Sequence, residues 1–399
     1  MAAGLAVEFA DELADGAKGA ALPLIRHDLG LSYTQIGLLA SVPLLVGGVL
    51  ELPLGVLAGE GRRRRLAVLG GGLLFVLALL GVAVAGSFAV LLAAFIAFYP
   101  ASGAFVSLTQ AELMDVWPQR QAQIMARWDL AGSAGAVAGP LLLTVVLAAG
   151  GDWRAGYLGL AGAAVLAWLG MALRRPPPAS SAAPPTASAP ARAEEAEDGR
   201  DWRARAREVL GALRDWGTVR WLLLIEVADL LVDVFTGFLG LYLVDVVHLA
   251  PGVAAVGIAI RLGAALAADA ALVVILERIE DLTVLRVSAA AALMLYPAFL
   301  VVPGAAGKLV VLALLSASTA PWYPLLQARL YGSLPGRSPV AVTLGSAAAL
   351  AGGLGPLAVG IAAGGFGLSR ALTGLAAVPA VILLVTVGGW GRDPAGERQ

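Results

Sequence analysis

The 399-residue sequence contains no cysteine and has only two histidines, His27 and His248. Without cysteine the protein forms no disulfide bond, thiolate metal site or thiol nucleophile. Two histidines are too few for a metal site built on imidazole ligands, although hard cations need only oxygen ligands. No nucleophile and base lie at a catalytic spacing, and no phosphate-binding glycine loop follows a strand. Nothing in the sequence therefore indicates an enzyme, a bound metal or a cofactor.

Charged residues are also scarce, at 14% of the chain, against about 25% in ordinary soluble proteins. Hydrophobic residues make up 59%, and the mean hydropathy is +0.84. A helix needs roughly 20 apolar residues to cross a hydrocarbon core of about 30 Å, so the chain is long enough for a dozen spans. The 50 glycines exceed the usual share of about 7% and suit close contact between membrane helices. These features predict an all-α integral membrane protein.

Twelve apolar windows separated by polar residues predict membrane spans at 3–25, 33–57, 66–86, 88–113, 123–149, 154–173, 219–246, 251–276, 284–303, 307–331, 338–363 and 368–389. The segment "RRPPPASSAAPPTASAPARAEEAEDGR" separates the sixth span from the seventh and is typical of an extended linker. We therefore expect an N-terminal six-helix bundle (1–173), a linker (174–217) and a C-terminal six-helix bundle (218–399).

The end of the linker, "RDWRARAREVLGALRDWGTVR", has apolar residues at helical spacing. This pattern predicts an amphipathic helix on the membrane surface, with an ordinary exposed linker helix as the alternative. Most arginines between the spans fall on the side that carries the termini and the linker, so the positive-inside rule places that side in the cytoplasm. We expect a multi-pass protein of the cell (inner) membrane.

The two halves of the chain repeat each other. "EFADELADGAKG" at residues 8–19 reappears as "EVADLLVDVFTG" at 226–237, and "QAELMDVWPQR" at 110–120 reappears as "QARLYGSLPGR" at 327–337. A later Gly-Pro pair at 139–140 matches a second one at 355–356. Three matches in the same order indicate duplication of a six-helix unit, with a substrate pathway between the two copies.

With twelve spans, a central linker and the arginine-rich loop "GVLAGEGRRRR" at 55–65, the chain resembles a Major Facilitator Superfamily transporter. Gly59 stands where that family usually has aspartate, so Glu60 is the candidate substitute in a gate that includes Arg62. "GSAGAVAGP" at 132–140 resembles the family's GxxxGP antiporter motif, carried by Gly135, Gly139 and Pro140. The first span and "LGLSYTQIGLL" resemble efflux members of the fosmidomycin-resistance type.

The first span is unusual because it contains five ionisable residues, Glu8, Asp11, Glu12, Asp15 and Lys18. Glu8, Asp11 or Glu12, Asp15 and Lys18 follow one another at intervals of three or four, which places them along one stripe of a helix. The seventh span carries a matching stripe of Glu226, Asp229 and Asp233. A charge at the bilayer centre costs about 2.5–3.5 kcal/mol on insertion scales, so both stripes should face the bundle interior. The resemblance implies that these two spans line the central cavity.

The depth of each acid suggests its role. Asp15 and Asp233 lie near the midplane and are the expected proton carriers, with Glu8 and Glu226 as relays nearer the cytoplasm. Moving a cation toward or away from a carboxylate changes its proton affinity, so we expect ion-pair partners at the same depth. These are Lys18 for Asp15 and Arg261 for Asp233. The alternative is that the acids, including Asp11 and Asp229, form static pairs that fix helix packing.

Other intramembrane charges are candidates for a gate on the cytoplasmic side, through salt bridges that also involve Glu60 and Arg62. They are Glu112, Arg127, Asp129, Asp269 and Arg329.

The predicted function is proton-coupled secondary transport by alternating access, with export of a small organic compound as in drug/proton antiporters. Proton-linked nutrient uptake and cation transport are the alternatives within transport. A membrane sensor or enzyme on a transporter fold is the alternative outside it, and the chain has no sizeable soluble domain to support one. The expected partners are a small-molecule substrate, protons and the lipid bilayer, with no nucleic acid, and the expected state is a monomer.

Overall fold

The computed structural model describes residues 1–57, 62–116, 121–174, 214–333 and 350–387, together with Gly211 and Ala348. Within these residues the regular structure is helical and contains no strand. The N-terminal half consists of α1 (Ala2–Leu29), α2 (Tyr33–Leu57), α3 (Arg62–Ala83), α4 (Phe88–Val116), α5 (Gln121–Ala148) and α6 (Trp153–Leu173).

The helices of the C-terminal half are divided into more pieces. The seventh span is built from α8 (Trp216–Asp229), η2 (Leu230–Val234), α9 (Phe235–Leu241) and η3 (Tyr242–Val246). After it come α10 (Pro251–Leu276), α11 (Asp281–Val301), α12 (Ala305–Thr319), α13 (Trp322–Ser333), α15 (Gly355–Phe366), α16 (Leu368–Thr373), η4 (Gly374–Ala376) and α17 (Ala377–Val387). When consecutive segments are joined into spans, most of the spans in both halves begin and end within a few residues of the predicted ones, and the all-helical fold class is confirmed.

Local sequence explains several helix ends. The Asp152 side chain accepts a hydrogen bond of 2.9 Å from the Ala155 N–H and so caps the start of α6. Pro251 occupies the first turn of α10, where its missing N–H costs nothing. Gly30 ends α1 in the left-handed conformation at φ 62°, which a residue without a side chain adopts freely.

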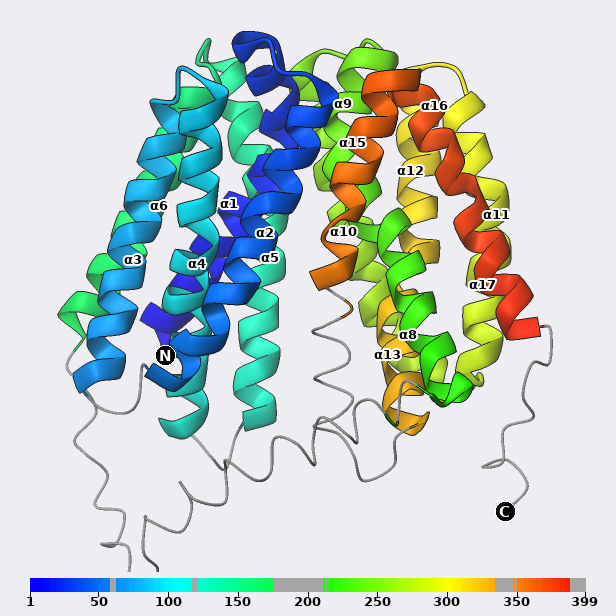
Figure 1. Ribbon diagram of the computed structural model, residues 1–399, viewed down its shortest axis with the longest axis horizontal. Coiled ribbons are helices and arrows are strands. Elements are labelled where there is room, and N and C mark those ends of the chain that lie inside the picture. Colours follow the sequence, from blue (N-terminus) through cyan, green and yellow to red (C-terminus); the bar gives the residue numbers. More distant parts are fainter. Residues whose placement is uncertain are drawn as a thin grey trace, which may run out of the picture.

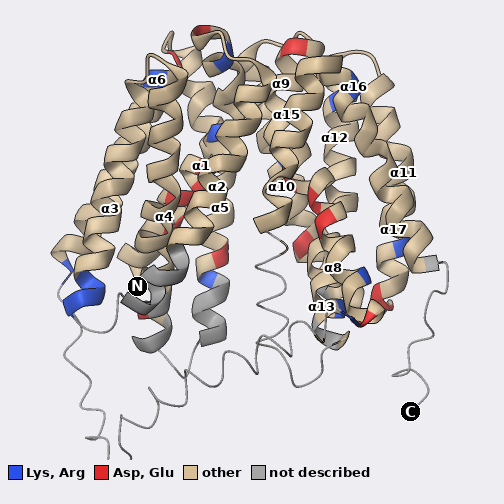
Figure 2. Ribbon diagram, in the orientation of Figure 1, with Lys and Arg blue, Asp and Glu red and all other residues tan. Residues whose placement is uncertain are grey.

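Successive spans run in opposite directions, and the turns that join them lie at two opposite ends of the molecule (Figure 1). We call the end with the N-terminus and the C-terminal end of α17 the terminal side, and the end with the α1–α2 turn the distal side. Lys and Arg lie mainly near the two ends, whereas acidic residues also occur at mid-height within both halves (Figure 2). Arg26, Arg154, Lys308 and Arg370 belong to the distal side, as the alternation of spans predicts.

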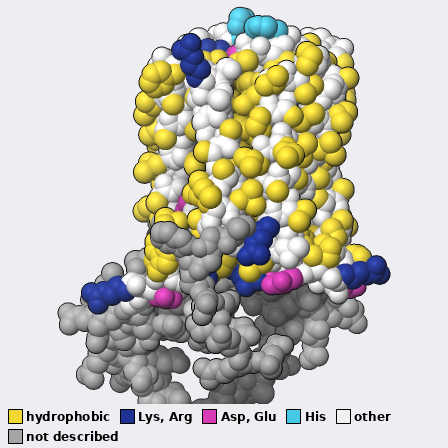
Figure 3. Space-filling view, turned by 90° about the vertical axis from the view of Figure 1, so that its right-hand side faces the viewer, with side chains coloured by type: hydrophobic (Ala, Val, Ile, Leu, Met, Phe, Trp, Pro, Cys, Tyr) yellow, Lys and Arg dark blue, Asp and Glu magenta, His cyan; other side chains and the backbone are white. Residues whose placement is uncertain are grey.

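The described residues include nine helices long and apolar enough to cross a membrane. The remaining spans are α1 with its charges, the segmented seventh span and the shorter apolar helix Leu350–Phe366. One outer face of the C-terminal half shows hydrophobic side chains over most of its height, with charged side chains near the two ends (Figure 3). This distribution suits a hydrocarbon belt with polar headgroups on both sides. The chain is a multi-pass membrane protein.

The two halves meet mainly where α2 packs against α15 and α5 against α10, and α1 also contacts α9 and α10. Many of these contacts lie toward the distal side. Thr144 donates a hydrogen bond of 3.4 Å to the Gly252 carbonyl, and the Leu357 N–H donates one of 3.0 Å to the Ser41 hydroxyl. At the terminal side the ribbons of the two halves are further apart (Figure 1).

Some predictions fall outside the described residues. These are most of the 174–217 linker with its amphipathic helix, Glu60 in the loop between α2 and α3, and the first part of the eleventh span. The boundaries of the two bundles and of the linker therefore remain predictions.

Candidate functional site

The acidic stripe of α1 changes in exposure along its length. Near the terminal side Glu8 is buried, whereas the side chain of Asp15, two turns further along, is 56% exposed. In the seventh span, Glu226 and Asp229 are half-buried and Asp233 is exposed. Each half therefore carries one accessible carboxylate near the middle of a membrane-spanning segment.

These two carboxylates act on each other from opposite halves. Asp233 lies within electrostatic range of Asp15. Just toward the distal side the two helices touch, because Gly240 packs directly against the backbone of Gly19. The described geometry thus brings Asp15 and Asp233 to the same level of the interface between the halves.

Lys18 forms the ion pair with Asp15 that its spacing suggested. Its Nζ donates to Asp15 Oδ1 at 3.2 Å and to the Tyr99 hydroxyl of α4 at 2.7 Å. The same ammonium lies 5.1 Å from the centre of the Tyr99 ring. The Lys18 side chain is only 19% exposed. Lys18 therefore has one charged and one neutral anchor, and sequence analysis had not singled out the neutral one.

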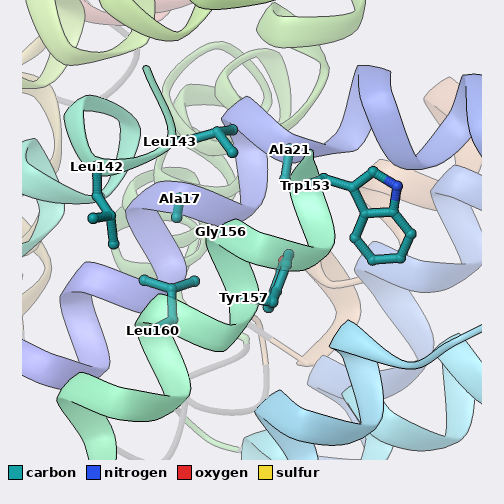
Figure 4. A pocket seen from close by; sticks show the side chains of 9 residues that line it. Ala17, Ala21, Leu142, Leu143, Trp153, Gly156, Tyr157 and Leu160 are labelled. Atoms are coloured by element: carbon teal, nitrogen blue, oxygen red, sulfur yellow. The ribbon is translucent and has the colours of Figure 1, made fainter. Parts of the chain in front are cut away.

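Tyr157 of α6 is a second tyrosine near this cation. It lies within electrostatic range of Lys18, Asp15 and Tyr99, but its buried hydroxyl has no hydrogen-bond partner among the residues that the structure describes. Its ring lines a small apolar cavity between α1, α5 and α6 (Figure 4). This cavity lies within the N-terminal half and is separate from the interface that carries Asp15 and Asp233.

The partner predicted for Asp233 is placed differently. Arg261 of α10 is buried and donates a hydrogen bond to the Val232 carbonyl, and it acts on Asp233 at electrostatic range without forming a direct ion pair. The local backbone explains the difference, because Val232 and Asp233 belong to the π-helical segment η2. Within this segment the Val232 carbonyl accepts from the Arg261 guanidinium and from the Thr236 hydroxyl, so side chains enter the backbone hydrogen-bond ladder there.

The acids nearer the terminal side pack against glycines. A Cβ atom on Gly132 of α5 would lie 2.7 Å from Glu8 Oε1. In the other half, Glu226 occupies the space beside Gly352. Trp128 and Asp129 also interact with Glu8. The first carboxylate of each stripe therefore contacts the fifth helix of its own half, as the internal duplication leads one to expect.

The GxxxGP-like motif lies where α1 and α5 are closest. A Cβ atom on Gly139 would lie 2.6 Å from the Ala17 backbone nitrogen, and one on Gly135 would lie 3.0 Å from the Leu13 nitrogen. The Pro140 carbonyl accepts a hydrogen bond of 2.9 Å from the Thr144 hydroxyl one turn further along α5. These residues hold the acidic helix directly against α5.

The predicted gating residues form contacts within their own halves. Glu112 lies 3.4 Å from Arg174, and Arg329 pairs through two nitrogens with Asp281. Arg62 and Asp269 are exposed, and Arg127 approaches the Met1 sulfur at 3.6 Å. In this conformation the described residues show no single salt-bridge network joining Glu112, Arg127, Asp129, Asp269 and Arg329, and their role in a gate remains a prediction.

A charged contact that sequence analysis missed joins the halves on the distal side. Arg26 donates to Asp245 Oδ2 at 2.9 Å, and the Tyr33 hydroxyl donates to the same oxygen at 3.0 Å. The Arg26 guanidinium also stacks over the Tyr33 ring at 4.2 Å. Among the ion pairs formed between described residues, Arg26–Asp245 is the one that crosses between the halves. We call these three residues the distal latch.

A signal for the latch was available in the sequence. Arg26 and Asp245 occupy nearly equivalent positions in the two repeats, at the distal ends of the first and seventh spans. Opposite charges at matching ends of two helices related by pseudo-symmetry are candidates for a contact across the symmetry axis.

Comparison with known proteins agrees with this architecture. The model of the Major Facilitator Superfamily matches residues 5–356. The chain belongs to the Major Facilitator Superfamily. Its membership, together with the fold of its structural neighbours, identifies it as a membrane transporter and not an enzyme. No curated protein matches the sequence.

Solved structures of transporters resemble this superfamily member over almost its whole length. The nucleoside transporter NupG has a TM-score of 0.76 at 10% identity, covering 98% of this chain and 100% of its own. A bacterial homolog of the human lysosomal transporter Spinster, in an inward-facing and unoccupied conformation, has a TM-score of 0.74 at 14% identity, covering 96% of each chain. A D-xylose–proton symporter has a TM-score of 0.73 at 12% identity, covering 100% of this chain and 99% of its own. At sequence identities this low, the structural similarity establishes a shared fold and not a shared substrate.

Proposed function

We propose that this superfamily member is a proton-coupled secondary transporter that works by alternating access and exports a small organic compound. The observation that carries the proposal is the pair Asp15 and Asp233. Each is an accessible carboxylate at mid-height of its half, each has a cation within range, and the two act on each other across the interface.

Electrostatics supplies a coupling mechanism. Two carboxylates facing each other at low dielectric repel, so closing the halves around them favours uptake of a proton. Opening the space between the halves returns water to both carboxylates, and the nearby cations Lys18 and Arg261 then favour release of the proton. A substrate that binds between the halves is then carried by the same movement that changes proton affinity.

The orientation of the chain gives this movement a direction. Arg62–Arg65, Arg174, Arg278 and Arg286 lie on the terminal side, which the positive-inside rule assigns to the cytoplasm. The distal latch then faces outward, and the described conformation is closed to the outside. Export is favoured over uptake by the GxxxGP-like motif in α5, whereas proton-linked uptake is the second candidate because a D-xylose–proton symporter shares the fold.

Proteoliposomes with the terminal side exposed test coupling and direction together. A pH-sensitive dye trapped in the lumen reports proton movement while ethidium, uridine or D-xylose is added outside under an imposed pH gradient. Export coupled to protons predicts that one class of compound enters the lumen as protons leave it. Proton and substrate movement in the same direction would instead establish symport.

Substitution of the two acids tests their role. We expect Asp15→Asn and Asp233→Asn each to abolish acceleration of transport by the pH gradient while leaving exchange of substrate across the membrane measurable. Asp28→Asn is the matched control, because Asp28 lies on the same helix but pairs with Arg154 on the distal side, 2.6 Å away. Gradient-driven transport that survives both substitutions would refute the assignment.

A further inference from the structure

Lys18 is a cation in a confined site inside the N-terminal half. Its side chain is 19% exposed, and its two hydrogen-bond acceptors are the Asp15 carboxylate on its own helix and the Tyr99 hydroxyl on α4. The exposed Asp15 is accessible from the space between the halves, whereas Tyr99 holds the other side of the ammonium. Loss of the Asp15 charge would leave the tyrosine as the remaining anchor.

We propose that Tyr99 is a positioning residue that keeps Lys18 on the wall of the N-terminal half while Asp15 is neutral. This inference rests on the proposed proton coupling through Asp15. The hydroxyl oxygen accepts a hydrogen bond of 2.7 Å from the ammonium, whose nitrogen lies 5.1 Å from the ring centre. This hydrogen bond is available whether or not Asp15 carries a proton, and it counts for more when Asp15 is neutral, because Lys18 then loses its charged partner.

Lys18 needs such an anchor because its ammonium group is largely buried. A cation removed from water needs a hydrogen-bonding partner, because a buried unpaired charge is strongly unfavourable. If Asp15 were the sole partner, each proton taken up by Asp15 would leave Lys18 without one. Tyr99 lowers that penalty and so makes the protonated state of Asp15 easier to reach.

Titratable and charged side chains from both halves surround the Lys18–Asp15 pair. Glu12 lies about one turn below Asp15 on α1, Tyr99 faces the pair from α4, and Tyr157 faces it from α6. From the other half, Asp233 acts on Asp15, with Arg261 beyond it. Tyr99 is the neutral group among them that bonds directly to Lys18.

Tyr157 provides a matched control. Both residues are tyrosines at the same ion pair. The Tyr99 hydroxyl bonds to Lys18, whereas the Tyr157 hydroxyl has no hydrogen-bond partner within the described part of the chain. Replacing each by phenylalanine keeps the ring and removes one oxygen. A difference between the two variants therefore isolates the hydrogen bond from the effects of packing and of a lost polar atom.

The test measures the pH at which transport in proteoliposomes is half-maximal, for the compound that moves with protons. In Tyr99→Phe the ionised Asp15 carboxylate is the remaining hydrogen-bond partner of Lys18. Protonating Asp15 then leaves Lys18 unpaired, so Asp15 takes up its proton at a lower pH. We expect the midpoint to fall by about half to one pH unit, the effect of one neutral hydrogen bond. In Tyr157→Phe we expect the midpoint to stay at the wild-type value. Melting temperatures of both variants check that the fold is retained.

A third variant separates loss of the Tyr99–Lys18 hydrogen bond from a general disturbance of the fold. In a Lys18→Gln background no cation needs to be held, so Tyr99→Phe should no longer move the midpoint. Equal shifts in the two tyrosine variants, an unchanged midpoint in Tyr99→Phe, or a shift that persists without Lys18 would each overturn the inference. Those outcomes differ from failure of the proposed function, in which wild-type transport itself would not respond to a pH gradient.

Discussion

Individual residues at the distal side hold the two halves together in the described conformation. Arg26 and Asp245 are partly buried, with side chains 27% and 19% exposed, and Tyr33 donates to the same carboxylate. A partly buried pair that has an additional hydrogen bond keeps more of its interaction energy than a fully solvated one. The distal latch therefore contributes to the preference for the state that is closed on this side.

Breaking the latch should shift the conformational equilibrium. If the pair contributes about 1 kcal/mol, Asp245→Asn raises the population open on the distal side about fivefold. The chain has no cysteine, so Ser41→Cys is a clean reporter of opening. Ser41 is fully buried against α15, and its cysteine should react faster with an impermeant maleimide in the Asp245→Asn background.

Two further variants separate the latch from nonspecific loosening. Exchange of the charges, Arg26→Asp with Asp245→Arg, should return labelling of the reporter toward the wild-type rate. Asp28→Asn breaks the distal ion pair with Arg154, which lies within one half, and should leave labelling unchanged. The latch assignment fails if Asp28→Asn accelerates labelling as much as Asp245→Asn does.

Among the helices, the seventh span shows how a local irregularity positions functional groups. The Phe235 N–H bonds to the Leu230 carbonyl and the Val247 N–H to the Tyr242 carbonyl, which are π-helical bonds. An extra residue rotates everything that follows by about 100° around the helix axis. Each π segment contains one aspartate, Asp233 or Asp245. One π segment thus carries the interface carboxylate Asp233, and the other carries Asp245, which bonds to Arg26 in the distal latch.

Helix packing between α1 and α5 depends on glycine. Gly139→Ala should destabilise the protein, because the added methyl group meets backbone atoms of α1 that no side-chain rotation relieves. We expect a loss of about 1–3 kcal/mol, seen as a lower melting temperature in detergent. Gly162→Ala on α6 is the control, since nothing lies within 4 Å of the new Cβ. Equal melting temperatures for both variants would contradict the packing role.

On the scale of the whole molecule, transport requires the distal contacts to separate. Thr144 and Gly252 touch across the halves, and a Cβ atom on Gly252 meets no other group. Joining Thr144→Cys and Gly252→Cys by a short bifunctional thiol reagent should stop transport. The single variants treated with the same reagent should transport at the rate of untreated protein. Undiminished transport after complete cross-linking would show that this part of the interface does not open.

Hydropathy and duplication in the sequence predicted most of this architecture. The twelve windows approximate the helices, and repeated residues such as Glu8 and Glu226 predicted two related halves. The Asp15–Lys18 pair also followed from helical spacing, because both residues lie on one regular helix. The Asp233–Arg261 pair was predicted from depth, and the structure instead places the Arg261 guanidinium on the Val232 carbonyl. Equal depth does not fix the direction in which a side chain points, and it gives no warning of a π segment.

The sequence by itself determined which segments cross the membrane and which of them carry charge, because the energy of transferring side chains into lipid depends on composition and local order along the chain. Tertiary structure decided which polar and charged groups meet between different helices. Tyr99 reaches Lys18 from α4, and Asp245 reaches Arg26 from the other half, through distances set by how closely glycine-lined helices approach and how π segments turn them. Such contacts depend on packing between helices far apart in the chain, so no pattern within one segment encodes them, and for Arg26 and Asp245 only a comparison of the two repeats gives a signal.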